Sequence, residues 1–203
     1  MPVVQVTVNG RVKALALLDS GSSSSFCSKF LADKLGLSGP VNTYLLHTLN
    51  MTVSQRSKVV KLSLKSDSGE SLDMSQVNVI DKIPTHLTEI DHSLNHLKDL
   101  ALPTYTENQH VDIVIGQDHA EALLPLDVRR GKSEEPFAVK TLLGWALYGY
   151  FPANKTGHKI VSHFISVLSN TVEDDVQNLW KMENDVNQCG FSVEDQSVLD
   201  LWD

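Results

Sequence analysis

Asp19 is the residue best placed to do chemistry in this 203-residue chain. It follows the apolar run Ala16 to Leu18 and is followed directly by Ser20 and Gly21. Such a run is typical of a buried strand, so the carboxyl group is expected at the inner end of that strand, where it can act as an acid or a base. About 95 residues further on, a second apolar run ends in glycine, at Val114-Ile115-Gly116.

The signatures of several other enzyme classes are absent from the sequence. It contains no Gly-x-Ser-x-Gly, no Walker phosphate loop, no Gly-x-Gly-x-x-Gly and no His-Glu-x-x-His. Four histidines are close enough along the chain to suggest a zinc site, namely His86, His92, His96 and His110. No cysteine and no clear third ligand at catalytic spacing completes that site. We therefore interpret them as surface residues and expect no metal and no cofactor.

Two strands and a short helix are predicted to position Asp19. Residues 3–8 and 12–18 are rich in β-branched and apolar residues, and Asn9-Gly10 between them suits a type I′ hairpin turn. After the serine-rich stretch, apolar residues recur at helical spacing and predict a helix that Gly36 ends. These apolar residues are Phe26, Phe30, Leu31 and Leu35, with Ser25 or Ser28 as the N-cap.

Strand patterns also dominate the residues that follow. The further predicted strands are 41–53, 58–65, 72–80, 111–115, 126–129 and 137–150. Residues 81–110 lose the alternation, which indicates an insertion or long loop with a helix near 89–100, and 117–124 has helical composition. The sequence therefore predicts a mainly β fold.

The formal net charge of -8 comes from the C-terminal segment. The chain has 17 basic and 25 acidic residues, and residues 173–203 hold nine of the acids and a single lysine. A negative balance argues against non-specific nucleic-acid binding. Partial capping boxes at Thr171 and Ser192 predict two helices there. We therefore predict a domain over 1–152, followed over 153–203 by a polar linker and an acidic helical connector.

The compartment is predicted from what the sequence lacks. No apolar run approaches the ~20 residues of a membrane-spanning helix, and the N-terminus has neither the basic nor the apolar region of a signal peptide. Cys27 and Cys189 are far apart in segments of different composition, which predicts two free thiols in a reducing compartment. We expect a cytoplasmic protein that binds neither a membrane nor nucleic acid.

The motif around Asp19 resembles that of the retropepsin-like aspartic proteases. The resemblance is closer still to the protease domain of BEL/Pao-type retrotransposon Pol polyproteins. Four blocks in the family's order carry the resemblance: Leu17 to Phe26 (LLDSGSSSSF), Val111 to Asp118 (VDIVIGQD), Lys140 to Gly149 (KTLLGWALYG) and Leu179 to Glu183 (LWKME). The resemblance implies the closed β-barrel of the acid proteases, a place inside the cell or a virus-like particle, and a C-terminal connector that leads toward a reverse transcriptase region.

The resemblance also implies an aspartic endopeptidase that cleaves its own polyprotein. Two carboxylates hold a water and share one proton, because like charges ~3 Å apart cannot both ionise. This chain has a single Asp-Ser-Gly, so each copy of a homodimer would contribute Asp19. Ser20 would hydrogen-bond its counterpart, and Gly21 would permit close backbone approach and strained dihedral angles.

Further site residues follow from the same resemblance. Leu18, Ile115 and Gly116 would support the catalytic loop. The 41–53 hairpin would form the flap over the substrate, with His47, Thr48 and Leu49 at its tip, although the glycine-rich tip common in this family is missing.

Alternative interpretations remain for the whole chain and for single residues. A decayed or domesticated copy could keep the fold as a folding or assembly module without catalysis. Asp112 and Asp118 flank the Ile-Gly motif, and we interpret them as a strand-edge residue and a helix N-terminal residue rather than a second catalytic acid. Trp145 and Tyr148 are interpreted as core or dimer-interface residues.

Overall fold

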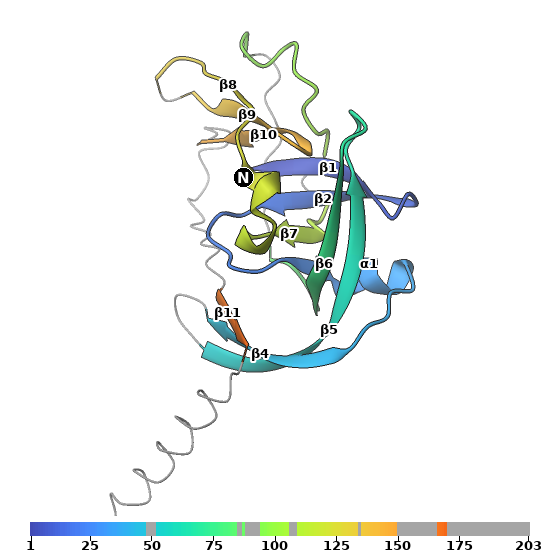
Figure 1. The fold of residues 1–203 in the computed structure, drawn as a ribbon. Coiled ribbons are helices and arrows are strands. Elements are labelled where there is room, and N and C mark those ends of the chain that lie inside the picture. The colour runs from blue at the N-terminus through green and yellow to red at the C-terminus, as the bar shows by residue number, and fades with distance from the viewer. Residues whose placement is uncertain are drawn as a thin grey trace, which may run out of the picture. The chain divides into compact units, whose positions relative to one another are not determined.

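The computed structural model is mainly β, as predicted (Figure 1). It describes residues 1–47, 52–84, 87, 94–105, 109–133, 135–149 and 166–169. The chain divides into two compact units, Met1–Val167 and Leu168–Asp203, and nearly all described residues belong to the first. The predicted linker and acidic helices lie outside the described residues, apart from the short strand β11 (Ser166–Ser169).

The first two strands form the predicted hairpin. β1 (Val3–Val8) and β2 (Val12–Leu18) pair antiparallel, with Val8 opposite Val12. Asn9 has a φ of 49° and Gly10 a φ of 65°, the pair of positive values that a type I′ turn requires. The hairpin therefore places β1 along one side of β2, the strand that ends just before Asp19.

A strand from a distant part of the sequence lies beside β2. The strand order of the main sheet is β1-β2-β7-β3-β6-β5-β4-β11. β7 (Ile113–Ile115) runs parallel to β2 and antiparallel to β3 (Phe26–Ser28). The loop that carries Asp19 therefore leaves β2 and returns as β3 around the end of β7.

The helix after this loop starts later than the spacing of apolar residues suggested. α1 (Lys29–Lys34) has Ser28 as its N-cap, whose Oγ accepts a hydrogen bond from the Leu31 amide, and Gly36 follows its end with a φ of 64°. Phe26 lies in β3 and not in the helix, so that part of the prediction is wrong. Its backbone pairs with strands on both sides, and this pairing outweighs the local helical spacing.

The predicted meander is present, with one difference. β4 (Val41–His47), β5 (Thr52–Lys65) and β6 (Ser71–Ile80) follow one another as antiparallel neighbours. The break expected between residues 53 and 58 does not occur. The first half of β5 pairs with β4 and the second half pairs with β6, so a single long strand replaces the two predicted ones.

A smaller sheet follows the 3-10 helix η1 (Gln117–Leu123). It has the strand order β10-β9-β8, from β8 (Asp127–Arg129), β9 (Phe137–Thr141) and β10 (Gly144–Tyr148). The single strand predicted over 137–150 is therefore wrong. The chain reverses before Gly144, whose φ of 123° favours glycine, and forms a hairpin.

The segment expected to hold a helix near 89–100 forms turns over 94–100, and residues 88–93 lie outside the described part of the chain. Leu97 is fully buried here and packs with Ala138 and Leu147 of the smaller sheet. Leu94, Leu100 and Leu102 of the same segment pack against this cluster. No helix among the described residues is long and apolar enough to cross a membrane.

We predict that the thiol of Cys27 is unreactive in the folded protein. Cys27 is buried in β3, and burial, aided by the nearby charge of Asp112, raises the pKa of its thiol to about 12. Because the thiolate is the reactive form, a Cys189→Ser variant should resist alkylation at pH 8 and react once denaturant unfolds it. Ser38→Cys in the same background is the control, since Ser38 is exposed and should be labelled in the native protein. Equal labelling of both thiols in native buffer would contradict the prediction.

Candidate active site

Backbone hydrogen bonds hold Asp19 at the end of β2. Its amide donates to the carbonyl oxygen of Ile115 at 2.9 Å, so the first residue beyond β2 is tied to the end of β7. The preceding amide, that of Leu18, donates to the carbonyl of Pro2 at 2.8 Å, and the Leu18 side chain lies in the main core. The position of Asp19 is therefore set by strands on both sides.

The two carboxylate oxygens of Asp19 have different surroundings. Oδ1 accepts a hydrogen bond of 2.9 Å from the amide of Gly21. Oδ2 is buried and has no hydrogen-bond partner among the described residues. Gly21 is not among the described glycines with positive φ, so the strained backbone expected there is not found. Instead, its amide orients the carboxyl group.

The close backbone approach occurs at Gly116, directly after β7. A Cβ at this position would lie 2.5 Å from the carbonyl oxygen of Ser24 and 2.8 Å from that of Ser22. The next residue, Gln117, donates its amide to the Ser22 carbonyl at 2.8 Å and its side-chain Nε2 to the Ser20 carbonyl at 2.9 Å. The end of β7 and the Asp-Ser-Gly loop are therefore packed backbone against backbone.

Behind this contact lies a network of buried hydrogen bonds centred on Ser25. The Ser25 hydroxyl donates to Oδ1 of Asp118 at 2.6 Å and accepts from the Gly116 amide at 3.0 Å. The Ser25 amide donates to Oδ2 of Asp118 at 2.8 Å. Nδ1 of His119 lies 3.0 Å from the Ser25 hydroxyl and 3.1 Å from Asp118 Oδ1. The network joins the two loops that surround Asp19.

Sequence reasoning missed the role of this network. Asp118 does lie in the first turn of η1, as interpreted, but its carboxylate also bonds Ser25 across 93 positions of the chain. The available signal was an acidic residue two positions after Ile-Gly together with a serine at the end of the Asp-Ser-Gly loop. Asp112 bonds the Ser28 hydroxyl at 2.7 Å through Oδ1. Asp118 therefore joins the two loops, while Asp112 holds Ser28, the N-cap of α1.

A small, apolar cavity opens beside Asp19. Its volume is about 30 Å³, which is room for roughly two water molecules. Apart from Asp19, its lining is apolar and consists of Leu17, Phe26, Ile80, Ile83, Pro84 and Val114. Ile83 and Pro84 fall in the segment that we interpreted as an insertion, so their place at the site was not predicted. A carboxyl in such surroundings can hold a water molecule away from bulk solvent.

The β4–β5 hairpin is connected to this cavity through its base. The ring of Tyr44, on β4, lies 6.4 Å from that of Phe26, which lines the cavity, and its hydroxyl donates to Gln55 of β5 at 3.2 Å. The backbone of His47 ends β4 opposite Thr52. Thr48 and Leu49 of the predicted flap tip lie outside the described residues.

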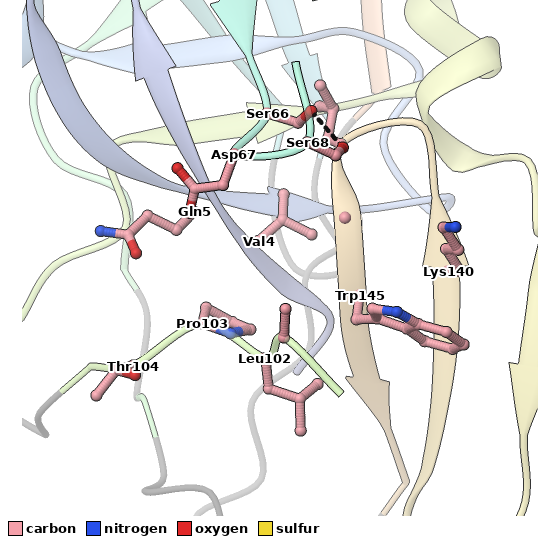
Figure 2. A pocket seen from close by; sticks show the side chains of 13 residues that line it. Val4, Gln5, Ser66, Asp67, Ser68, Leu102, Pro103, Thr104, Lys140 and Trp145 are labelled. Carbon is pink, nitrogen blue, oxygen red and sulfur yellow. Dashed lines mark hydrogen bonds between the residues drawn. The ribbon is translucent and has the colours of Figure 1, made fainter. Parts of the chain in front are cut away.

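A larger cavity, of about 400 Å³, lies away from Asp19 (Figure 2). Its wall includes Val4 of β1, the turn after β5 and Trp145 of β10. Trp145 also packs against the cluster around Leu97, and Tyr148 stacks on Phe137 at 5.6 Å between ring centres. None of the residues of the Asp-Ser-Gly loop lines this cavity, so it is separate from the candidate site.

The described residues contain no cluster of three or more residues that could hold a metal ion. His96 is partly buried, and its Nε2 lies 2.8 Å from the Pro136 carbonyl oxygen, so it is not the free surface residue that we expected. His86 and His92 lie outside the described part of the chain.

We predict that Ser25→Ala destabilises the fold by about 1–3 kcal/mol, because it leaves the Gly116 amide and the Asp118 carboxylate short of buried hydrogen-bond partners. The measurement is the free energy of unfolding in urea. Ser38→Ala, at an exposed serine, is the control and should change it by less than about 0.5 kcal/mol. If both variants change the free energy of unfolding by similarly small amounts, the network contributes little to stability.

We predict that Gly116→Ala is more damaging than Ser25→Ala. Its methyl group would collide with two backbone carbonyl oxygens, which cannot rotate away as a side chain can. Either the loop of Asp19 or the end of β7 must shift, so the midpoint of thermal unfolding should fall further than for Ser25→Ala. An unchanged midpoint would mean that the two loops separate at little cost.

Comparison with known proteins agrees with this geometry. The model of the aspartyl protease family matches residues 4–119, which is more than half of the chain. The matched range contains the Asp-Ser-Gly loop, β7, Gly116 and Asp118. No curated protein and no solved structure matches the chain. Asp19 lies at the end of a buried strand, and the backbone of Gly116, directly after β7, is packed against its loop. Together with this match, we conclude that the chain belongs to the aspartyl protease family.

Proposed function

We propose that two copies of this chain form an aspartic endopeptidase in which each copy contributes Asp19. One observation carries the proposal: Oδ2 of Asp19 is buried beside an apolar cavity and has no partner among the described residues. An unpartnered buried carboxylate oxygen costs free energy, and a second carboxyl that shares a proton with it would remove that cost. The sequence contains a single Asp-Ser-Gly, so the second carboxyl would come from another copy.

The chemistry follows from such a pair. With one proton between them, the ionised carboxylate takes a proton from a water molecule, and the water oxygen attacks the carbonyl carbon of the peptide bond. The protonated carboxyl gives its proton to the carbonyl oxygen. The carboxyl that took the proton from water then gives it to the amide nitrogen, and the C–N bond of the tetrahedral intermediate breaks. The other carboxylate takes the proton of one hydroxyl group, which leaves an acid and an amine and restores the singly protonated pair.

The surroundings of Asp19 suit this reaction. The Gly21 amide holds Oδ1 and leaves Oδ2 directed away from it. The cavity has room for a water molecule beside the carboxyl, and its apolar lining would keep bulk water from the reacting atoms. The β4–β5 hairpin, packed on Phe26 through Tyr44, is the segment that we assign to the flap.

The substrate that we assign is the polyprotein of a BEL/Pao-type retroelement. The four sequence blocks described above support this origin, and the block from Lys140 to Gly149 forms most of the β9–β10 hairpin. The pairing of β1 with β5 supports closure of the main sheet into a barrel. In this proposal residues 153–203 lead toward a reverse transcriptase region, and the protein acts inside the cell or a virus-like particle.

The alternative is a catalytically silent domain that serves as a folding or assembly module. It would keep the same β fold and the same Asp-Ser-Gly loop, so the geometry within one copy fits both functions. Turnover of a peptide distinguishes them.

We predict that the purified chain cleaves peptides at mildly acidic pH and that Asp19→Asn abolishes the cleavage. An asparagine cannot share a proton with a partner carboxyl, so it cannot take part in activating the water. The measurement is mass spectrometry of a digested peptide library, which gives the cleavage sites as well.

Asp73→Asn is the matched control, because Asp73 is exposed on β6 and should leave cleavage unchanged. Circular dichroism of both variants checks the fold. Equal cleavage by the wild type and Asp19→Asn would point to a contaminating protease, and a folded, dimeric wild type without any cleavage would favour the silent module.

A further inference from the structure

The outer edge of β1 is only partly covered by a neighbouring strand. The Leu18 amide donates to the Pro2 carbonyl, so the backbone groups of the even-numbered residues along β1 face β2. The groups of the odd-numbered residues face the opposite edge. There β5 pairs with β1 through Thr7 and Val8. Among the described strands, none lies opposite the next odd-numbered residue, Gln5.

β5 leaves β1 at a tight turn. Ser66 follows the last residue of β5, and the Gly69 amide donates to the Ser66 carbonyl at 3.1 Å. If β5 continued straight, Asp67 would lie opposite Gln5. Instead the chain turns back as β6, and within the described part of the chain no hydrogen bond reaches the outward amide or carbonyl of Gln5. Unpaired groups at a strand edge are a template for a further strand.

The cavity of about 400 Å³ lies at this gap (Figure 2). Val4 and Gln5 of β1 line it together with the turn after β5. In Figure 2, Leu102, Pro103 and Trp145 lie across the cavity from that turn. The volume falls within the range of ligand sites, about 300–1,000 Å³. An unpaired strand edge and a cavity of useful size therefore occur at the same place.

The cavity walls suit an apolar side chain. Val4, Pro103 and Leu143 are buried in the lining, and Leu102 and Trp145 are partly buried. Side chains that face each other in an antiparallel strand pair lie on the same face of the sheet. In a strand added to this edge, the residue opposite Val4 would therefore point to the Val4 side and into the cavity.

The charged residues of the lining already have opposite charges beside them. Asp67 lies 3.6 Å from the ammonium group of Lys13. Lys140 of β9 lies directly opposite Asp127 of β8 in the register of the smaller sheet. The other polar side chains of the lining are hydroxyls and one amide. A charged ligand would meet no unmatched opposite charge, so these surroundings favour an uncharged one.

We propose that the edge of β1 at Gln5 binds an extended, uncharged peptide segment as an added antiparallel strand, with a large apolar side chain of that segment in the cavity beside Trp145. The antiparallel direction continues that of β5, which pairs with β1 just before the gap. Backbone hydrogen bonds would supply affinity, and the cavity would supply side-chain preference. The proposal is independent of the proposed function, because Asp19 does not line this cavity.

The test uses the acetylated and amidated peptide Thr-Val-Thr-Phe-Thr-Val-Thr. It is titrated into a protein in which Trp180→Phe and Trp202→Phe leave Trp145 as the only tryptophan and Asp19→Asn prevents cleavage. Because Trp145 is partly exposed, its emission should shift as the peptide covers it, with a Kd of about 1 mM or lower. The Gln5 amide should become protected from hydrogen exchange over the same range of peptide concentration.

Methylated peptides test the pairing itself. Opposite Val4, the backbone groups of the phenylalanine would face away from β1, whereas those of the two threonines beside it would bond β1. N-Methylation of these two threonines should therefore abolish binding. N-Methylation of the phenylalanine is the matched control and should leave binding unchanged.

Two variants at one position separate the backbone from the side chain. Gln5→Pro removes the outward amide, which lies on the side of β1 away from β2, and should abolish binding. Gln5→Ala keeps the amide and should bind the peptide as the unsubstituted position does. Circular dichroism checks the fold of both, and the methylated peptides decide the question if Gln5→Pro does not fold.

Binding of the parent and the phenylalanine-methylated peptide, without binding of the threonine-methylated one, would support the proposal. No change in Trp145 emission up to about 1 mM peptide, or equal binding of both methylated peptides, would overturn it. Binding that leaves the exchange of the Gln5 amide unchanged would place the peptide elsewhere, for example at the candidate active site, and would also overturn it. Because these results do not depend on peptide cleavage, this proposal and the proposed function can fail separately.

Discussion

The arrangement around Asp19 depends on how closely the backbone of Gly116 approaches the loop that carries this residue. No side chain fits there, because a Cβ would lie within 3 Å of two carbonyl oxygens. Only a glycine at this point lets β7 end between β2 and β3 and lets the Ile115 carbonyl accept the Asp19 amide. The glycine thus serves the fold and the candidate site through the same contact.

Polar groups around this contact are paired, with one exception. Ser25 and Asp118 use both backbone and side-chain atoms to join the two loops. Oδ2 of Asp19 is the only buried side-chain oxygen or nitrogen among the described residues that lacks a partner. In folded proteins, nearly all buried polar atoms have a hydrogen-bond partner. Departures from this rule are most often found at functional sites, so the unpaired oxygen marks Asp19 as a candidate functional residue.

The sequence by itself determined the features whose signals are local. The Asn9-Gly10 turn, Ser28 as one of two candidate caps and the alternation of residues 58–65 could be predicted because each depends on residues a few positions apart. Asp19 stood out because the apolar run before it predicts a buried strand. Only the tertiary structure decided that Phe26 is a strand residue, since its pairing partners come from distant segments.

The same limit applies to the candidate site. Ser25 and Asp118 are 93 positions apart, and Ile83 reaches the cavity from a segment without a clear periodic pattern. No short pattern encodes such contacts, because they arise when β7 takes its place in the middle of the sheet. A local sequence pattern therefore identifies Asp19 as the catalytic candidate. Which residues hold Asp19 in place is determined by the packing of strands that are distant in the sequence.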